Sequence, residues 1–434
     1  MEIIYGGLEY NLPKIIRVEQ IFKEHKIKNI ENHIEKQLYS NKNRKKIKKN
    51  MRIGLCVGSR GISEITRILK KVISELKKMG AHPFIIPSMG SHGDACSLGQ
   101  KNILKTYGIT EKKMGVPIIS SLDVVKLKGK FMKEDIFFDK IAYKADGIIP
   151  INRIKCHTDF RGNVESGLCK MLVIGLGNHQ GASQVHSLGY DKFDTAIPGI
   201  ANIIINNVNI LFGIAILEDA NNNVAELDVV LPENFIYQEG ILLKKSKNIM
   251  AKINIKKIDV LVIKEMGKDI SGTGMDPNII GRFRGRSRKI NDISAPKVKI
   301  IIVHDLTANS MGNAEGVGYA DIITRDLYNK IDLKTTYTNI CVGKDDYILH
   351  EAKIPMIIDS EKDSIALGAK ITNRKNILNS RIVLIKNTLN LNKIYVSNNI
   401  YDEIKNKDNF SIDEDENFKN MEFDNKGRIN NLTW

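Results

Sequence analysis

The sequence contains no apolar run of the roughly 18 or more residues that a membrane-spanning helix requires. The best candidate, residues 201–217, is interrupted by four asparagines, Asn202, Asn206, Asn207 and Asn209. The first ten residues also lack a basic stretch followed by an apolar stretch, which is the pattern of a secretory signal. We therefore expect neither a membrane span nor export.

Cysteine is scarce in this chain. The 434 residues include five cysteines, an odd number, and no two have C-x-x-C spacing: Cys56, Cys96, Cys156, Cys169 and Cys341. A disulfide framework needs paired cysteines and an oxidising compartment. The cysteine pattern therefore predicts a cytoplasmic protein with reduced thiols.

Aromatic residues make up only 6% of the chain, and their scarcity bears on the interpretation of its charge. A formal net charge of +16 is by itself typical of nucleic-acid-binding proteins. Only residues 41–50 are densely basic, and no aromatic side chain is interleaved there to stack on bases. We expect no nucleic-acid partner. The segment is either a solvated connector or an electrostatic funnel for an anionic substrate.

Alternating strand and helix patterns dominate the part of the chain that follows. Residues 51–58 form a short apolar run typical of a buried strand, and from Ser63 to Gly80 the apolar residues have helical spacing. Residues 82–89 form a second such run, and a second helix is expected to end near Tyr107. This alternation predicts an α/β fold with a parallel sheet.

The pattern continues to the second half of the chain. Further apolar segments occupy 147–151, 164–176, 210–217, 258–267 and 298–305. The pattern starts again near residue 255, and 42% apolar residues suffice for more than one core. We expect two α/β lobes followed by a surface helix and tail, at residues 1–250, 251–397 and 398–434.

Polar residues follow three of the expected strands directly, at 58–61 (GSRG), 90–93 (GSHG) and 152–157 (NRIKCH). The carboxyl ends of parallel strands meet at one edge of a sheet, where ligands bind in α/β proteins. The three loops are therefore expected to converge on one cleft.

Four side chains in or after these loops carry groups that catalysis uses. His92 is flanked by glycines, which permit close ligand approach, so it is either a functional group or an ordinary surface histidine. His157 lies beside basic residues and Asp159, and its role is either structural or catalytic. Lys170 lies in a largely apolar stretch, where a lysine either snorkels outward or is used covalently. His186 is unremarkable by itself.

Glycine-rich segments leave further alternatives open. Gly175, Gly177 and Gly181 form a loose variant of the dinucleotide-binding fingerprint, which would make the chain a nicotinamide-dependent oxidoreductase. In the second half, residues 267–278 and the basic residues 282–289 either bind a carboxylate or phosphate together or form solvated loops.

Taken in order, seven motifs resemble the nickel-pincer-dependent lactate racemase family over about residues 1–390: GSRG, PSMGSHGDA, LKTYGI, NRIKCHTDF, ESGLCKMLVIGLG, VHSLGY and GKDISGTGMDPN. The resemblance is closer to a divergent branch of uncharacterised isomerases than to the lactate racemases themselves. It implies a bilobed α/β fold with an interdomain active-site cleft. The first lobe would carry the cofactor and the catalytic histidines, and the second would close on the substrate.

The resemblance also implies a cofactor, the nickel-pincer nucleotide. This is a pyridinium mononucleotide whose thioamide and thiocarboxylate arms hold nickel through two sulfurs and a ring carbon. In the family a lysine tethers it as a thioamide, one histidine completes the nickel shell, and two further histidines act as general base and acid. Enzymes of cofactor synthesis are then expected as partners.

The family's residues carry over onto this sequence at five positions. Lys170 matches the tethering lysine, and His186 matches the nickel ligand. His92 and His157 match the two catalytic histidines, although His157 lies somewhat farther before the lysine than is usual. Arg60 matches an arginine that contacts the substrate.

The substrate contacts of the second lobe depart from the family pattern. The family's second-lobe lysine has no clean match, and either Arg282 or Arg284 falls near it. Spacing from Asp276 and Asn278 favours Arg284. A nearby glutamine of the racemases is replaced around Gly281. These departures concern the identity of the substrate and leave the chemistry unchanged.

The reaction implied by the resemblance is racemisation or epimerisation of a small 2-hydroxy acid by reversible hydride transfer. The hydrogen on the hydroxyl-bearing carbon is barely acidic, so it leaves more easily as hydride while a histidine takes the hydroxyl proton. Arginine's planar fork suits the substrate carboxylate. A nicotinamide-dependent oxidoreductase and a non-catalytic binding protein on the same fold are the alternatives.

Overall fold

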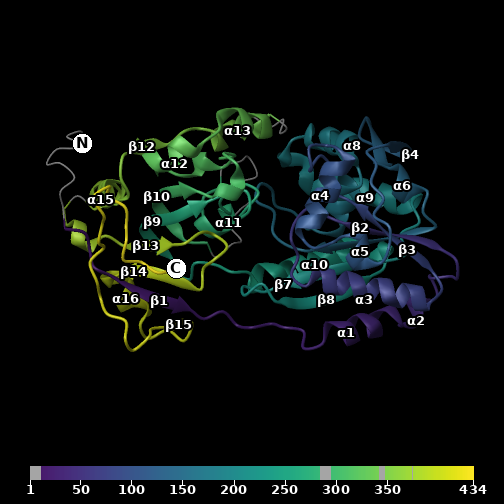
Figure 1. Ribbon diagram of the computed structural model, residues 1–434, viewed down its shortest axis with the longest axis horizontal. Coiled ribbons are helices and arrows are strands. Elements are labelled where there is room, and N and C mark those ends of the chain that lie inside the picture. The colour runs from purple at the N-terminus through teal and green to yellow at the C-terminus, as the bar shows by residue number, and fades with distance from the viewer. Residues whose placement is uncertain (1–10, 284–294, 342–347, 374) are drawn as a thin grey trace. The chain divides into compact units, whose positions relative to one another are not determined.

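The structure, a computed structural model, describes residues 11–283, 295–341, 348–373 and 375–434 (Figure 1). The predicted substrate residue Arg284 lies outside the described residues. The chain divides into two compact units. One is Lys23–Met250, and the other combines Ala251–Trp434 with the N-terminal residues up to Phe22. No helix in the described parts of the chain is long and apolar enough to cross a membrane.

The unit 23–250 is built on a five-stranded sheet with the order β3-β2-β6-β7-β8. The strands are β2 (Arg52–Val57), β3 (His82–Pro87), β6 (Gly147–Arg153), β7 (Gly213–Glu218) and β8 (Val224–Val230). All neighbours are parallel except β7 and β8. The α/β fold class predicted from the alternating pattern is confirmed.

Helices cover both faces of this sheet because the strands are apolar on both sides. In β2, Leu55 and Val57 join a core that includes residues of α1 (Ile30–Leu38), α3 (Ile65–Lys78) and α4 (Ser97–Thr106). Cys56 points to the other face, into a core built with α9 (Phe193–Asn207) and α10 (Phe235–Ile249). The remaining elements of the unit are α2 (Asn41–Arg44), α5 (Glu111–Met114), the hairpin β4 (Val124–Phe131) and β5 (Glu134–Asp139), α6 (Lys140–Tyr143), α7 (Leu168–Lys170), η1 (Met171–Gly175), α8 (Asn178–His186), η2 (Tyr190–Lys192) and η3 (Pro232–Asn234).

The other unit has an eight-stranded mixed sheet with the order β12-β11-β10-β9-β13-β14-β1-β15. The strands are β1 (Ile15–Gln20), β9 (Lys257–Met266), β10 (Lys297–Leu306), β11 (Ile322–Thr324), β12 (Met356–Ile358), β13 (Ile382–Ile385), β14 (Lys393–Ser397) and β15 (Phe410–Ser411). Its helices are α11 (Pro277–Ile280), η4 (Ala308–Ser310), η5 (Val317–Tyr319), α12 (Arg325–Lys330), α13 (Leu333–Ile340), α14 (Ile348–Glu351), α15 (Glu361–Thr372), η6 (Ile377–Asn379) and α16 (Asn398–Ile404).

The two ends of the chain meet in this sheet. β1 pairs in antiparallel fashion with both β14 and β15, and Ile15 exchanges backbone hydrogen bonds of 2.9 Å with Lys419. The last residues are also held, because the Tyr395 hydroxyl contacts the backbone of Thr433 and the ring of Trp434 lies 5.7 Å from that of Tyr395. The residues expected to form a surface tail therefore include packed parts of the second unit.

Candidate functional site

The order of strands in the unit 23–250 places a topological switch point between β2 and β6. From β2 the chain moves to β3 on one side, whereas from β6 it moves to β7 on the other side. Loops that leave neighbouring parallel strands in opposite directions open a crevice at their carboxyl ends, and ligands of α/β proteins bind there. The GSRG loop follows β2 and the NRIKCH loop begins at the end of β6, so these two predicted functional loops flank the switch point.

The loop with His92 is held against the loop after β2 and against η1. Nδ1 of His92 lies 2.5 Å from the hydroxyl oxygen of Ser59. The N–H of Gly90 donates to the carbonyl of Gly175 at 3.0 Å. Gly90 has φ +61°, and a Cβ there would lie 3.1 Å from the carbonyl oxygen of Ile174. Only glycine meets both demands without strain, so this residue brings the third loop against η1, beside the loop after β2.

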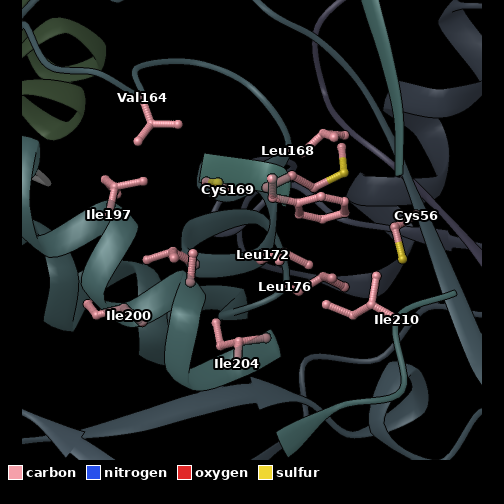
Figure 2. Packing of buried hydrophobic residues seen from close by; sticks show 14 of the residues in the cluster. Cys56, Val164, Leu168, Cys169, Leu172, Leu176, Ile197, Ile200, Ile204 and Ile210 are labelled. Atoms are coloured by element: carbon pink, nitrogen blue, oxygen red, sulfur yellow. The ribbon is translucent and has the colours of Figure 1, made fainter. Parts of the chain in front are cut away.

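Lys170 ends a short helix that continues as the π-helical segment η1. The side chain of Asn152 donates to the carbonyl of Gly167 at 2.8 Å, which joins the end of β6 to the start of this helix. Figure 2 shows the apolar neighbours of Lys170, including Cys169 and Leu172, packed with side chains of α9 in the core. π-helical turns are rare and occur frequently at functional sites. The apolar stretch thus anchors the segment and carries the lysine at its polar edge.

The amine of Lys170 makes a short hydrogen bond with Nε2 of His157. On the other side of the imidazole, the backbone N–H of Asp159 donates to Nδ1 at 3.0 Å. The ring of Phe160 lies 4.5 Å from the imidazole. Burial lowers the pKa of Lys170 to about 8, with the Asp159 carboxylate opposing and the Arg60 charge adding to this shift. About a tenth of the amine is therefore uncharged at pH 7, far more than in a lysine with the ordinary pKa.

Both histidines near this lysine are held neutral. Burial, and then the charge of Lys170, lower the pKa of His157 well below its usual value. The same two causes lower the pKa of His186 to about 4. The ring of His186 lies 5.7 Å from that of Tyr190 and 5.4 Å from that of Phe193. A neutral imidazole in an aromatic setting is able to accept a proton or to bind a metal.

The structure brings five of the predicted residues to one end of one sheet. His92 contacts Ser59 next to Arg60, and Arg60 and His186 both interact electrostatically with Lys170. Arg282 belongs to the other unit and has protein acceptors there. Its guanidinium donates to the Asp321 carboxylate at 2.6 Å and to the carbonyls of Tyr319 and Lys299 at 2.9 and 3.1 Å. Its substrate role stays a prediction.

Sequence reasoning did not assign roles to three residues of the site. Ser59 contacts His92, Tyr190 packs on His186, and Glu165 accepts the backbone N–H of His157. For Glu165 a signal existed, because it begins the apolar ESGLCKML stretch, where an acidic residue is expected to be buried and paired. The contacts of Ser59 and Tyr190 join segments whose proximity only the fold creates.

The interpretation of Gly175, Gly177 and Gly181 as a dinucleotide turn is wrong in its structural context. That fingerprint requires a strand before the glycines and a helix after them, whereas here η1 comes first. A Cβ on Gly175 would lie 2.6 Å from the carbonyl oxygen of Ser88, and one on Gly177 would lie 2.7 Å from that of Val173. These two glycines are needed for close backbone packing.

A cavity of about 550 Å³ lies at the opposite edge of the sheet. It is lined by Arg52 and His82 at the amino ends of β2 and β3, and by Gly80 and Gly115, which follow helix C-termini. Lys77 donates there to the carbonyl of Gly115 at 2.7 Å. Lys77 thereby offsets the negative C-terminal end of α5.

The described residues contain no group of three or more His, Cys, Asp or Glu side chains that would hold a metal ion by themselves. The groups that the structure brings together near the switch point are one amine with a lowered pKa, the neutral imidazoles of His157 and His186, and nearby cations. Such a set is able to form an amide-type bond, to move a proton, to bind a carboxylate and to donate one nitrogen to a metal.

Comparison with known proteins supports the fold. Residues 47–231, less than half of the chain, match a family described as a domain of unknown function, DUF362. The lactate racemase apoprotein from Thermoanaerobacterium thermosaccharolyticum is similar in structure, with a TM-score of 0.51 and 13% identity over 86% of this chain and 99% of that chain. A structural-genomics target from Thermotoga maritima gives a TM-score of 0.49 and 12% identity over 83% and 96%. No curated protein matches the sequence.

Proposed function

We propose that this chain is an isomerase that racemises or epimerises a small 2-hydroxy acid, with a nickel-pincer nucleotide attached to Lys170 and His186 as its nickel ligand. One observation carries the proposal. A lysine whose partly buried amine makes a hydrogen bond with a buried imidazole lies at the switch point of an α/β sheet, within electrostatic reach of a second histidine. The fold is that of a lactate racemase apoprotein, which supports the same class of reaction.

The residues present fit such a cofactor. Attachment through a thioamide needs an uncharged amine as the nucleophile, and the lowered pKa of Lys170 supplies one. A nickel ion that already has three donors from its cofactor needs one more to complete a square-planar shell. His186 is neutral and able to give that nitrogen without a protein-only metal cluster.

When bound, the cofactor would supply a reversible acceptor for hydride. The protein's own task is then to handle the hydroxyl proton and to hold the carboxylate. His92 and His157 take and return that proton. Arg60 binds the carboxylate. Attachment at Lys170 removes the lysine charge, which is the second largest cause of the low pKa of His157.

The proposal is tested by producing the chain with and without the cofactor-synthesis enzymes. The intact mass of the chain should show a covalent increment, and peptide mapping should locate it on the peptide that contains Lys170. Metal analysis should find about one nickel per chain. Lys170→Arg should lack the increment. His186→Ala should keep it, lose nickel and still fold, as circular dichroism would show. An active protein with unmodified Lys170 would contradict the proposal.

The hydride route has a separate test. Substrate deuterated at the reacting carbon should keep its label through many turnovers in ordinary water, because hydrogen that moves as hydride does not exchange readily with solvent. Rapid washout of the deuterium would instead indicate proton abstraction from carbon. In that case His92 and His157 would be ordinary carbon-acid bases.

A further inference from the structure

The loop that carries His157 is closed at its base and filled by one acidic side chain. Lys155 and Ser166 exchange two backbone hydrogen bonds of 3.0 and 3.2 Å, so residues 155–166 form a closed loop between β6 and α7. The side chain of Glu165 lies inside the loop and is fully buried. A loop without helix or strand pairing must satisfy its backbone groups by other means.

Glu165 supplies acceptors for this loop. One of its carboxylate oxygens accepts the backbone N–H of His157 at 2.7 Å. The other accepts the N–H of Gly162 at 3.4 Å and lies 3.0 Å from the amine of Lys247 on α10. A single carboxylate thus connects two parts of the loop, His157 and Gly162, with each other and with helix α10.

Arg161 binds the carbonyl side of His157. Its guanidinium lies 3.7 Å from the Glu165 carboxylate and donates to the carbonyl oxygens of His157 and Phe160 at 2.6 and 3.0 Å. The N–H and the C=O of His157 are therefore both bound by members of one ionic group, which we define as Arg161, Glu165 and Lys247.

We infer that Glu165 is a positioning residue, which with Arg161 and Lys247 holds the imidazole of His157 against Lys170. Burying an ionic group contributes little net stability, because desolvation offsets the attraction between the charges. Its value here is geometric, since it fixes the backbone on both sides of His157. Calling His157 catalytic rests on the proposed function, whereas its placement by Glu165 does not.

The decisive variant is Glu165→Gln. An amide has one acceptor oxygen where the carboxylate has two, so the variant side chain cannot accept from the His157 N–H and also face the Lys247 ammonium favourably. In the unloaded protein labelled with ¹⁵N-histidine, we expect the ring resonances of His157 to shift and broaden, while those of His92 and His186 stay in place. Adding Lys247→Met removes the ammonium that faces the new amide and should return the His157 signals toward their original positions.

Two further variants make the test complete. Glu75→Gln is the matched control, because Glu75 is also a buried carboxylate between two lysines, Lys71 and Lys78, and lies on α3 away from the loop. It should leave His157 unchanged. If Glu165→Gln does not fold, Lys247→Met alone should produce a smaller shift of His157, because Arg161 still pairs with Glu165.

In active enzyme, Glu165→Gln should lower kcat roughly 10- to 100-fold, because displacing the His157 imidazole by about 1 Å costs up to about 100-fold in rate. KM should change less than about threefold. Unchanged His157 resonances in Glu165→Gln, or equal shifts at all three histidines, would overturn the inference. If Glu165→Gln shifts the His157 resonances but the wild-type chain never takes up the cofactor, the positioning role of Glu165 stands and only the proposed function is refuted.

Discussion

At the scale of single residues, burial determines the chemistry of Lys170. Its amine is partly buried beside the core of the unit 23–250 and makes a hydrogen bond with a neutral imidazole, and burial is the largest cause of its lowered pKa. A lysine that only snorkelled outward would keep its charge and its usual pKa. Lys170 is therefore hydrogen-bonded within the site, and its covalent use is part of the proposed function.

The lowered pKa predicts how fast Lys170 is acylated. Its folded-state pKa of about 8 means that half of the amine is free at pH 8, whereas an ordinary lysine with a pKa near 10.4 is almost fully protonated. Competitive labelling of the unloaded protein with acetic anhydride, followed by peptide mass spectrometry, should give a midpoint near pH 8 for Lys170. The exposed Lys105 serves as the internal reference. A midpoint above pH 10 for Lys170 would refute the assignment.

Arg60 offers a second prediction at this scale. If it binds the substrate carboxylate, Arg60→Ala removes a charge-assisted hydrogen bond worth about 1.5–3 kcal/mol, so kcat/KM should fall roughly ten- to 150-fold. Attachment of the cofactor should be unaffected, as intact mass would report. Steady-state kinetics equal to wild type would mean that the carboxylate is bound elsewhere.

At the scale of elements, η1 joins the loop after β3 to the helix that bears Lys170. The segment is anchored by apolar residues of the α9 core, as Figure 2 shows for Leu172 and Leu176. Its polar connection is the hydrogen bond from Gly90 to the carbonyl of Gly175. The loop of His92 and the helix of Lys170 should therefore respond together to a change at this contact.

Gly175→Ala tests this coupling. Its Cβ would lie 2.6 Å from the backbone oxygen of Ser88, so a backbone segment has to move. We expect a loss of about 1–3 kcal/mol in the free energy of unfolding, measured by urea denaturation, together with slower labelling of Lys170. Gly61→Ala is the control, because its Cβ would meet only the Tyr107 ring at 3.4 Å. Equal stability of the two variants would refute the packing role of Gly175.

At the scale of the whole molecule, the two units differ in how they are assembled from the chain. The unit Lys23–Met250 is continuous in sequence and has cores on both faces of its sheet. The other unit needs β1 from the N-terminus, which lies between β14 and β15. Its Ile15 packs in one core with Val260 and Tyr395. The second unit is therefore discontinuous.

This difference predicts the behaviour of fragments. Residues 23–250 expressed alone should fold, with a cooperative thermal transition in circular dichroism, because their strands and cores are complete. Residues 251–434 without the N-terminal segment should lack a cooperative transition, since β14 then presents an unpaired edge. Adding a peptide of residues 11–22 should restore it. A cooperative transition of the 251–434 fragment by itself would contradict the prediction.

The strands near the site were predictable because their signals are local. Residues 51–58 and 82–89 read as buried strands, and β2 and β3 occupy Arg52–Val57 and His82–Pro87. The motif-based assignments of Lys170, His186, His92 and His157 also needed only the sequence, through the resemblance to a family. Their roles stay predictions until the experiments above are done.

The sequence by itself thus determined the α/β class, the strands that end at the switch point and the candidate residues, because apolar periodicity and motif order are written in neighbouring positions. Only the tertiary structure decided that Arg282 donates to Asp321 and that Glu165 accepts the backbone N–H of His157. It also decided that Gly175 packs on Ser88 and that β1 pairs in the second sheet. These facts depend on groups far apart in the chain, or on a loop whose shape follows no repeat. Their hydrogen bonds and contacts exist only after the backbone has folded.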